Sequence, residues 1–447
     1  MGKLFGTDGI RGVANRDLTP ELAYKIGRIA AYLLGREESR PLFVIGRDTR
    51  LSGTMLEGSL VAGITSTGAV AHLLGVASTP AVSFATRRLQ ATAGVVISAS
   101  HNPIEYNGLK IFDRRGMKLP DTLEEEIEKV YLASTDDMPR PEGDCVGQAL
   151  YDHDSLDHYL SFLKETAPSL DGMRLVVDCG HGACCRVAED LLRSLGAAVV
   201  MLHDTPDGGR INVNCGATDT ADLQQEVIRV GANLGLAFDG DADRLIAVDE
   251  KGNQVDGDAV MAICALDLVR QGRLKNNTLV ATVMSNGGLD ILGEEHGFSV
   301  IRTAVGDRFV LERMLAGGYN LGGEQSGHVI FADYSTTGDG LLTALQLLKV
   351  VRRQERPLSE LASRLTRLPQ VLHNQVVRNQ EGWEKKEAIT AAVREVEAAL
   401  GRYGRVLVRA SGTEPLIRVM LEAPLPEDKL REYAQLLAGI IVREQAG

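Results

Sequence analysis

Residues 94–103 read Gly-Val-Val-Ile-Ser-Ala-Ser-His-Asn-Pro, a hydrophobic run that ends in a small polar corner. Valine and isoleucine are β-branched, so the run predicts a buried strand. The pair Asn102-Pro103 prevents a helix from starting at once, because a residue before proline is pushed out of the α region. Ser100 is therefore expected on a sharp corner beside His101, displayed rather than packed. Such a serine is a nucleophile, a phosphate carrier or only a turn residue.

Three other stretches repeat this pattern of a buried strand that runs into a Gly-rich polar turn. They cover residues 42–53, 175–182 and 279–288. A segment with helical spacing follows each of them, which is typical of the βα unit of a largely parallel sheet. The pattern predicts an α/β fold of three related domains with mixed, largely parallel sheets.

The pattern changes beyond residue 369, where strands and helices follow one another in the order β-α-β-β-α. We expect strand 371–378, helix 384–400, strands 404–409 and 416–422, and helix 427–443. This order predicts a smaller α+β C-terminal domain.

Two stretches rich in helix breakers are expected linkers, at residues 134–154 and 353–370. We therefore expect four domains. They are a serine-loop domain at 1–153, a carboxylate-bearing domain at 154–254, a third α/β domain at 255–368 and the α+β domain at 369–447.

Composition restricts the function classes that fit the chain. Its 447 residues are 44% hydrophobic, which is typical of a multidomain α/β enzyme. The 48 Lys and Arg against 60 Asp and Glu give a net charge of −12, which disfavours binding to nucleic acid or an anionic membrane. No signal region or membrane helix is visible, so we expect a cytoplasmic protein. The six cysteines lack CxxC spacing and are expected to be reduced.

The strongest chemical signal is the segment Phe238-Asp-Gly-Asp-Ala-Asp-Arg244, with three carboxylates at alternate positions after an apolar run. Three anions so close repel one another unless a cation holds them, and all-oxygen ligands favour Mg²⁺ or Ca²⁺. An EF-hand does not fit, because Arg244 stands where that loop needs glycine and a strand pattern follows. A solvated acidic loop is the alternative.

Four further positions carry weaker signals. The Gly-rich stretch 6–12 places Arg11 either in a site-lining loop or in a structural turn. Lys110 follows Ser100 closely and, taken alone, is expected on the solvated surface. Residues 322–328 suit sugar hydroxyls or form a plain turn, and residues 409–415 suit a phosphate cradle or a simple turn.

Five motifs in order resemble the α-D-phosphohexomutase superfamily: GTDGIRG (6–12), SASHNP (98–103), DGDADR (239–244), GGEQSGH (322–328) and RASGTEP (409–415). The chain is most similar to the bacterial branch that interconverts glucosamine 6-phosphate and glucosamine 1-phosphate and supplies UDP-N-acetylglucosamine for cell-wall precursors. The resemblance implies four domains around a central cleft and an intramolecular phosphotransferase that works through a phosphoserine and a bisphosphorylated sugar.

The resemblance also implies a role for each motif. Ser100 would carry the phosphate and would bind Mg²⁺ together with Asp239, Asp241 and Asp243. Sugar hydroxyls would contact Glu324 and Ser326. The non-reacting phosphate would be held by Arg409, Ser411, Gly412, Thr413 and Arg418. The reacting end would be lined by Arg11, His101, Lys110, Arg244 and His328, with Lys110 and His328 as the candidates for accepting the hydroxyl proton. Because the sugar must turn end for end, we expect the fourth domain to move over the cleft.

Other functions stay open at this point. A phosphomannomutase or phosphoglucomutase of the same superfamily would share every catalytic element. A metal-dependent sugar phosphatase, or a sugar-phosphate sensor without turnover, would use the same parts. The expected partner is a small sugar phosphate, without nucleic acid or membrane, and a homodimer stays open.

Overall fold

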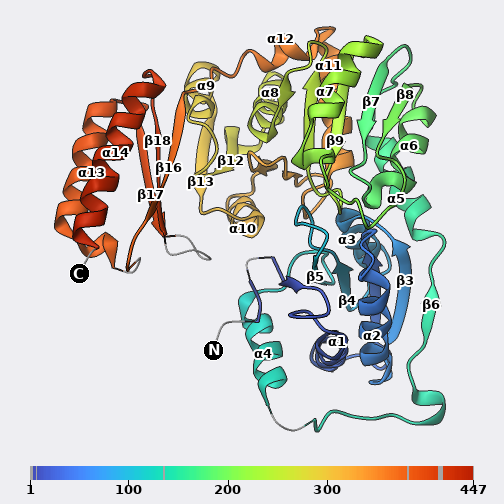
Figure 1. Cartoon of the computed structure of the whole chain (residues 1–447). Coiled ribbons are helices and arrows are strands. Elements are labelled where there is room, and N and C mark those ends of the chain that lie inside the picture. The colour runs from blue at the N-terminus through green and yellow to red at the C-terminus, as the bar shows by residue number, and fades with distance from the viewer. Residues whose placement is uncertain (1–3, 7, 134–135, 380–381, 411–415, 446–447) are drawn as a thin grey trace. The chain divides into compact units, whose positions relative to one another are not determined.

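The protein is described from a computed structural model that covers residues 4–6, 8–133, 136–379, 382–410 and 416–445. It divides into two compact units, which are described separately. The first holds residues 1–284 and 300–364, and the second holds residues 285–299 and 365–447 (Figure 1). Within the described residues, no helix is both long enough and apolar enough to cross a bilayer.

The first sheet of the large unit has six strands. In spatial order they are β1 (Ile10–Val13), β5 (Tyr106–Asp113), β4 (Ala93–Ile97), β2 (Leu42–Arg47), β3 (Val70–Val76) and β6 (Ala149–Tyr151). The neighbours of β2 and β3 run parallel, whereas β5 is antiparallel to both β4 and β1. Helices of this part are α1 (Pro20–Gly35), α2 (Gly53–Thr65), α3 (Thr79–Arg88) and α4 (Asp121–Leu132). The start of α1 is set by Thr19, whose side chain accepts the Leu22 N–H as an N-cap.

The second sheet has five strands in the order β11 (Gln254–Val255), β10 (Leu245–Asp249), β9 (Leu234–Phe238), β7 (Arg174–Asp178) and β8 (Ala198–Leu202). The pairs around β7 are parallel and those around β10 are antiparallel. Its helices are α5 (Ser155–Thr166), α6 (Ala188–Ser194) and α7 (Ala221–Val230).

The third sheet has four strands in the order β13 (Ser299–Thr303), β12 (Thr278–Thr282), β14 (Leu321–Gly323) and β15 (Val329–Phe331). Helices α8 (Gly257–Arg270), α10 (Asp307–Gly317), α11 (Gly340–Gln354) and α12 (Leu358–Ala362) accompany it. The prediction of mixed, largely parallel α/β sheets is therefore confirmed.

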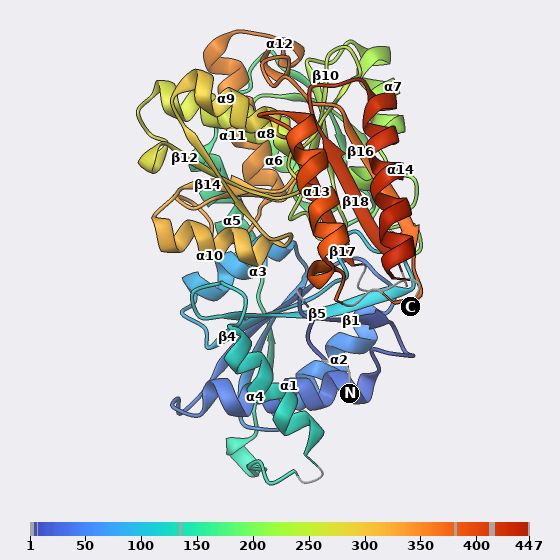
Figure 2. The same ribbon diagram turned by 90° about the vertical axis from the view of Figure 1, so that its left-hand side faces the viewer.

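The second unit contains a three-stranded antiparallel sheet in the order β16 (Gln370–Val376), β18 (Leu416–Glu422) and β17 (Arg405–Ala410). Helices α13 (Glu387–Leu400) and α14 (Glu427–Glu444) lie side by side along it, and their apolar faces form one core with the strands (Figures 1 and 2). Helix α9 (Gly288–His296) also belongs to this unit. The predicted β-α-β-β-α order is confirmed.

Both expected linkers contain regular structure. Strand β6 lies within the first and pairs in parallel with β3 at the edge of the sheet. It is three residues long and exposed, so it leaves no hydrophobic pattern in the sequence. Helix α12 lies within the second, where Pro357 precedes its first residue and is compatible with a helix start.

Candidate active site

Loops that follow strands of all three sheets meet in the large unit. The Ser100 loop follows β4 and the aspartate loop follows β9. The Thr79 N–H, at the start of α3, donates to the Asp241 carbonyl (3.0 Å), and the Leu245 N–H donates to the Gly327 carbonyl (3.0 Å). These backbone hydrogen bonds hold the aspartate loop against the start of α3 and against the 322–328 loop.

Ser100 is buried at this junction, with 1% of its surface exposed. Its φ of 53° lies in the left-handed region, which is uncommon for a residue with a side chain. The Ser100 hydroxyl donates to Asp239 Oδ2 (2.6 Å). The expectation of a displayed serine is wrong, because the loops of the second sheet cover the corner. The hydroxyl is aimed at a carboxylate instead of solvent.

A buried ion pair holds the Ser100 loop in this conformation. The Arg50 guanidinium donates to the carbonyls of Ser100 (2.9 Å) and Asn102 (2.7 Å), and also to those of Pro103 and Tyr106. Its Nε donates to Asp48 Oδ2 (2.9 Å). The Ser98 hydroxyl donates to the same Asp48 oxygen and accepts the Ser100 N–H (2.8 Å). The sequence predicts a plain polar turn at residues 46–53, and nothing in that stretch indicates that Arg50 would hold the Ser100 loop.

The three aspartates converge as the sequence predicted. Asp239, Asp241 and Asp243 are all buried, and one oxygen of each lies within 4.8 Å of the others. Burial, followed by the charges of Asp243 and Asp241, raises the pKa of Asp239 well above its usual range. The Oδ1 atoms of Asp241 and Asp243 are buried and accept no hydrogen bond from the described residues. Orphaned carboxylate oxygens of this kind fit a hard divalent cation.

Lys110 lies beside these carboxylates and is 1% exposed, so its expected place on the solvated surface is wrong. Its Nζ lies 2.8 Å from Asp241 Oδ2, 3.4 Å from Asp243 Oδ2 and 3.2 Å from Asp8 Oδ2. Burial alone would lower the pKa of Lys110, but Asp241, Asp8 and Asp243 outweigh it and raise the pKa well above its usual range. The ammonium is therefore a fixed positive charge.

The other predicted residues of the reacting end also lie here. Arg11 donates to Asn102 Oδ1 (3.0 Å) and pairs with Asp8. Arg244 Nε lies 3.8 Å from Asp243 Oδ1. Burial, with Arg244 and Arg11 nearby, lowers the pKa of His101 to about 4, so its imidazole is neutral near pH 7.

His328 is buried between acidic groups. Its Nδ1 lies 3.6 Å from Asp243 Oδ2 and its Nε2 lies 3.7 Å from Asp307 Oδ2. Burial lowers the pKa of His328, but Asp243 and Asp307 outweigh it and raise the pKa to about 9. The Gly338 N–H donates to Nε2 (3.0 Å), so the ring takes up a second proton only by giving up this hydrogen bond.

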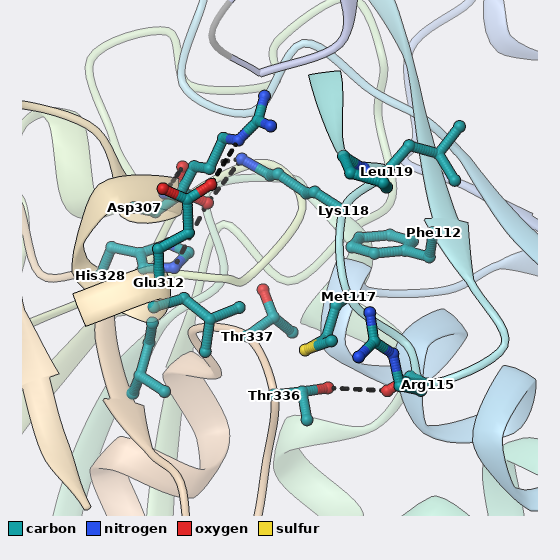
Figure 3. A pocket seen from close by; sticks show the side chains of 14 residues that line it. Phe112, Arg115, Met117, Lys118, Leu119, Asp307, Glu312, His328, Thr336 and Thr337 are labelled. Atoms are coloured by element: carbon teal, nitrogen blue, oxygen red, sulfur yellow. Dashed lines mark hydrogen bonds and ion pairs between the residues drawn. The ribbon is translucent and has the colours of Figure 1, made fainter. Parts of the chain in front are cut away.

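A cavity of about 170 Å³ is lined by His328 together with residues that include Lys118 and Asp307. Figure 3 shows Lys118, Asp307 and His328 pointing toward one another in its wall. Lys118 Nζ lies 2.6 Å from Asp307 Oδ2 and also pairs with Asp8. The pair Lys118–Asp307 links the segment after β5 to the start of α10, and the pair Lys118–Asp8 joins Lys118 to the segment before β1. No motif pointed to Lys118 or Asp307, because each stands alone in its own stretch of sequence, and the 6–12 motif that contains Asp8 indicated only Arg11.

The predicted sugar loop lies directly against the aspartate loop. Glu324 Oε1 accepts the Gly306 N–H (3.0 Å), and Ser326 is exposed. Gly327 has a φ of 95°, and a Cβ there would stand 2.2 Å from the Leu245 carbonyl oxygen. Only glycine allows this contact, so the loop is built for close approach to the start of β10.

The predicted phosphate loop belongs to the second unit. Arg409 and Arg418 stand directly opposite each other on β17 and β18. Burial, together with the Arg418 charge, lowers the pKa of Arg409. Like charges in this position destabilise a sheet, which is consistent with an anion between them. Ser411, Gly412 and Thr413 lie outside the described residues.

Comparisons with known proteins agree with this arrangement. Family models match the four phosphoglucomutase/phosphomannomutase domains in order: alpha/beta/alpha domain I at 2–138, domain II at 157–252, domain III at 256–368 and the C-terminal domain at 372–440. The chain is 54% identical over 445 residues to a phosphoglucosamine mutase of Alkaliphilus oremlandii, with 99% of each chain covered. It is 56% identical over 425 residues to a phosphoglucosamine mutase of Symbiobacterium thermophilum, covering 94% of this chain and 95% of that protein.

A solved structure shares the fold. It is a phosphoglucomutase/phosphomannomutase family protein from Burkholderia thailandensis, with a TM-score of 0.81, 24% identity and 98% of each chain covered. Three findings agree: four matched domains, two relatives above 50% identity, and the meeting of four of the five sequence motifs within the large unit. The chain belongs to the phosphoglucomutase/phosphomannomutase family of α-D-phosphohexomutases.

Proposed function

We propose that this enzyme is a phosphoglucosamine mutase that interconverts D-glucosamine 6-phosphate and α-D-glucosamine 1-phosphate through a phosphorylated Ser100. The substrate follows from the two relatives above 50% identity that carry this name. The observation that carries the mechanism is the Ser100 hydroxyl, held 2.6 Å from Asp239 within a trio of buried carboxylates.

Asp239, Asp241 and Asp243, together with the phosphate on Ser100, would hold one Mg²⁺. The orphaned Oδ1 atoms of Asp241 and Asp243 support this choice, since Mg²⁺ prefers oxygen ligands. Bound there, the ion would neutralise charge on the phosphoryl group.

The first transfer breaks the bond between Ser100 Oγ and phosphorus and forms a bond from phosphorus to the free hydroxyl oxygen of the sugar monophosphate. The hydroxyl loses its proton, and Ser100 leaves with its oxygen protonated. The product is a sugar bisphosphate. After the sugar turns end for end, the other phosphate returns to Ser100 by the reverse reaction.

The side chains around Ser100 position and stabilise this transfer. Phosphoryl transfer depends on alignment and charge neutralisation more than on covalent help. Lys110, with its raised pKa, stays protonated and offers a fixed positive charge to the moving group. Arg11 and Arg244 add guanidinium donors, and His101, neutral near pH 7, lines the same end.

Lys110 is a poor proton acceptor because it already carries its proton. His328, whose pKa is raised to about 9, gives up its proton more readily than Lys110, and its Nε2 accepts the Gly338 N–H in the neutral form, so it is the better candidate of the two. A His328→Gln variant that keeps the wild-type pH profile of turnover would remove it from this role.

Sugar selection would fall to Glu324 as an acceptor and Ser326 as a donor to neighbouring hydroxyls. The non-reacting phosphate would bind between Arg409 and Arg418, with Ser411, Gly412 and Thr413 completing the loop. We propose that the C-terminal domain moves to admit the sugar and to let it turn. The cytoplasm is the proposed location, and a homodimer is the assembly to test by light scattering.

Two measurements made together test this function. Mass spectrometry of the purified chain should find one phosphate on Ser100. Assays with glucosamine, glucose and mannose phosphates, side by side, should show the highest kcat/KM for glucosamine. Preference for glucose or mannose would assign the chain to a phosphoglucomutase or phosphomannomutase instead. Release of inorganic phosphate without isomerisation would make it a phosphatase.

A further inference from the structure

A second set of metal-ligating side chains converges in the second sheet, apart from the aspartate trio. Asp178 ends β7, His203 follows β8, and Cys215 lies in the loop before α7. One ligand atom of each lies within 4.8 Å of the other two. A carboxylate, an imidazole and a thiol form the mixed oxygen, nitrogen and sulfur set that zinc accepts and that magnesium does not.

The closest pair already stands at the spacing of two ligands on one ion. His203 Nδ1 lies 3.1 Å from Asp178 Oδ2. Around a tetrahedral zinc with bonds of about 2.0–2.1 Å, two such atoms lie about 3.3 Å apart. His203 Nδ1 is buried, yet it forms no well-aligned hydrogen bond with the described residues. The two atoms therefore lie at the spacing of two ligands without a well-aligned hydrogen bond between them.

The groups around these three side chains match the outer shell of a metal site. Asp178 Oδ1 accepts the Gly180 N–H and Oδ2 accepts the Gly216 N–H, both at 2.9 Å. His203 Nε2 lies 3.5 Å from Asp222 Oδ2. A ligating histidine usually directs its second ring nitrogen to a carboxylate in this way, and ligating carboxylates are themselves hydrogen-bonded.

The Cys215 thiol and the His203 imidazole are both available to a metal ion. Cys215 Sγ makes a weak hydrogen bond to the Arg210 carbonyl oxygen at 3.8 Å. His203 is 23% exposed, which gives an ion and a water molecule access to the cluster. On binding, the sulfur–hydrogen bond of Cys215 is replaced by a sulfur–metal bond and the proton passes to solvent.

We propose that Asp178, His203 and Cys215 bind one zinc-class divalent ion, with water as the fourth ligand. Metal binding would stabilise the loop that contains Cys215, which contacts the Ser100 loop. Asn212, in the same loop as Cys215, donates to the Ser100 carbonyl (2.9 Å). A Cβ on Gly216 would stand 2.4 Å from the carbonyl oxygen of Phe238, the residue before Asp239, so the braced loop touches the start of the aspartate loop.

Cobalt titration tests the proposal, because a thiolate ligand gives Co²⁺ a strong charge-transfer band in the near ultraviolet that oxygen ligands do not. The full-length chain is stripped with chelator, kept in excess Mg²⁺ to occupy the aspartate trio, and titrated with Co²⁺. We expect the band to saturate at one equivalent and to disappear when Zn²⁺ is added. Cys215→Ser and His203→Gln should lose the band, while Cys185→Ser, which removes a neighbouring thiol outside the trio, should keep it.

A second readout covers variants that are poorly folded in the absence of metal. Zn²⁺ should raise the melting temperature of the wild-type chain and of Cys185→Ser, and leave that of Cys215→Ser unchanged. Absence of the band in the wild-type chain overturns the proposal. So does a band that persists in Cys215→Ser, or one that is lost in Cys185→Ser alone.

Discussion

Replacing Arg50 by lysine should impair catalysis although the Arg50 side chain is fully buried beneath the Ser100 loop. The guanidinium spans four carbonyls of the loop 100–106 and the Asp48 carboxylate. Lysine keeps the charge but has three donors from one atom instead of a planar fork of five. At least two of the five contacts are lost, each a hydrogen bond to a charged group worth about 1.5–3 kcal/mol. The loop is therefore destabilised by about 3–6 kcal/mol.

The hydrogen bonds lost in Arg50→Lys hold Ser100, whose backbone is strained. The left-handed conformation of Ser100 costs about 1–3 kcal/mol and persists only while its surroundings enforce it. Once these hydrogen bonds are lost, the Ser100 hydroxyl should leave its position beside Asp239. A displacement of about 1 Å at a reacting atom can cost about 100-fold in rate. We therefore expect kcat of Arg50→Lys to fall about 100-fold, with a smaller change in KM.

The assay is steady-state turnover, combined with hydrogen exchange of the peptide that covers residues 98–107. Arg47→Lys is the matched control, since Arg47 ends β2 three residues before Arg50 and its guanidinium pairs with Glu57. It should keep near wild-type turnover. Wild-type kcat and unchanged exchange in Arg50→Lys would refute the reasoning, and so would equal losses in the two variants.

Three further predictions concern the surrounding structure. Gly327→Ala should raise KM and lower the melting temperature, because its Cβ would clash with the Leu245 carbonyl; Gly58→Ala in α2, where a Cβ meets no neighbour, should be neutral or slightly stabilising. Burial raises the pKa of Asp339 to about 6, so stability that is present below the ordinary aspartate pKa is lost as pH rises through about 6. Wild-type unfolding free energy relative to Asp339→Asn should fall by about 2 kcal/mol from pH about 4 to about 7, and a flat difference would contradict this. Chelation of divalent ions should abolish turnover and Mg²⁺ should restore it, whereas full activity in chelator would remove the metal from the mechanism.

The sequence predicted a feature correctly where all the residues that determine it lie in one stretch of chain. The aspartate trio needed only its own spacing and the strand before it, and it lies where predicted. The C-terminal elements followed from hydrophobic periodicity, and α14 and β18 end within a residue of their expected bounds. The boundaries at 154, 255 and 369 stay predictions.

The sequence failed where a residue's surroundings come from distant segments. Lys110 reads as a surface lysine until Asp8, Asp241 and Asp243 are placed around it. Ser100 reads as a displayed corner because nothing in its own stretch reveals the loops that cover it. The same reason hides Arg50 and the cluster around Cys215, whose partners meet only in the folded chain.

The turnover of Ser100→Ala tests the central claim most directly. The variant should fold, with a melting temperature close to that of the wild-type chain. Serine already occupies the positive φ at this position, so alanine gives up only the hydrogen bond to Asp239. Interconversion of glucosamine 6-phosphate and glucosamine 1-phosphate should drop at least about 1,000-fold, and no phosphate should be found on the chain. Isomerisation at the wild-type rate by this folded, unphosphorylated variant would contradict the account.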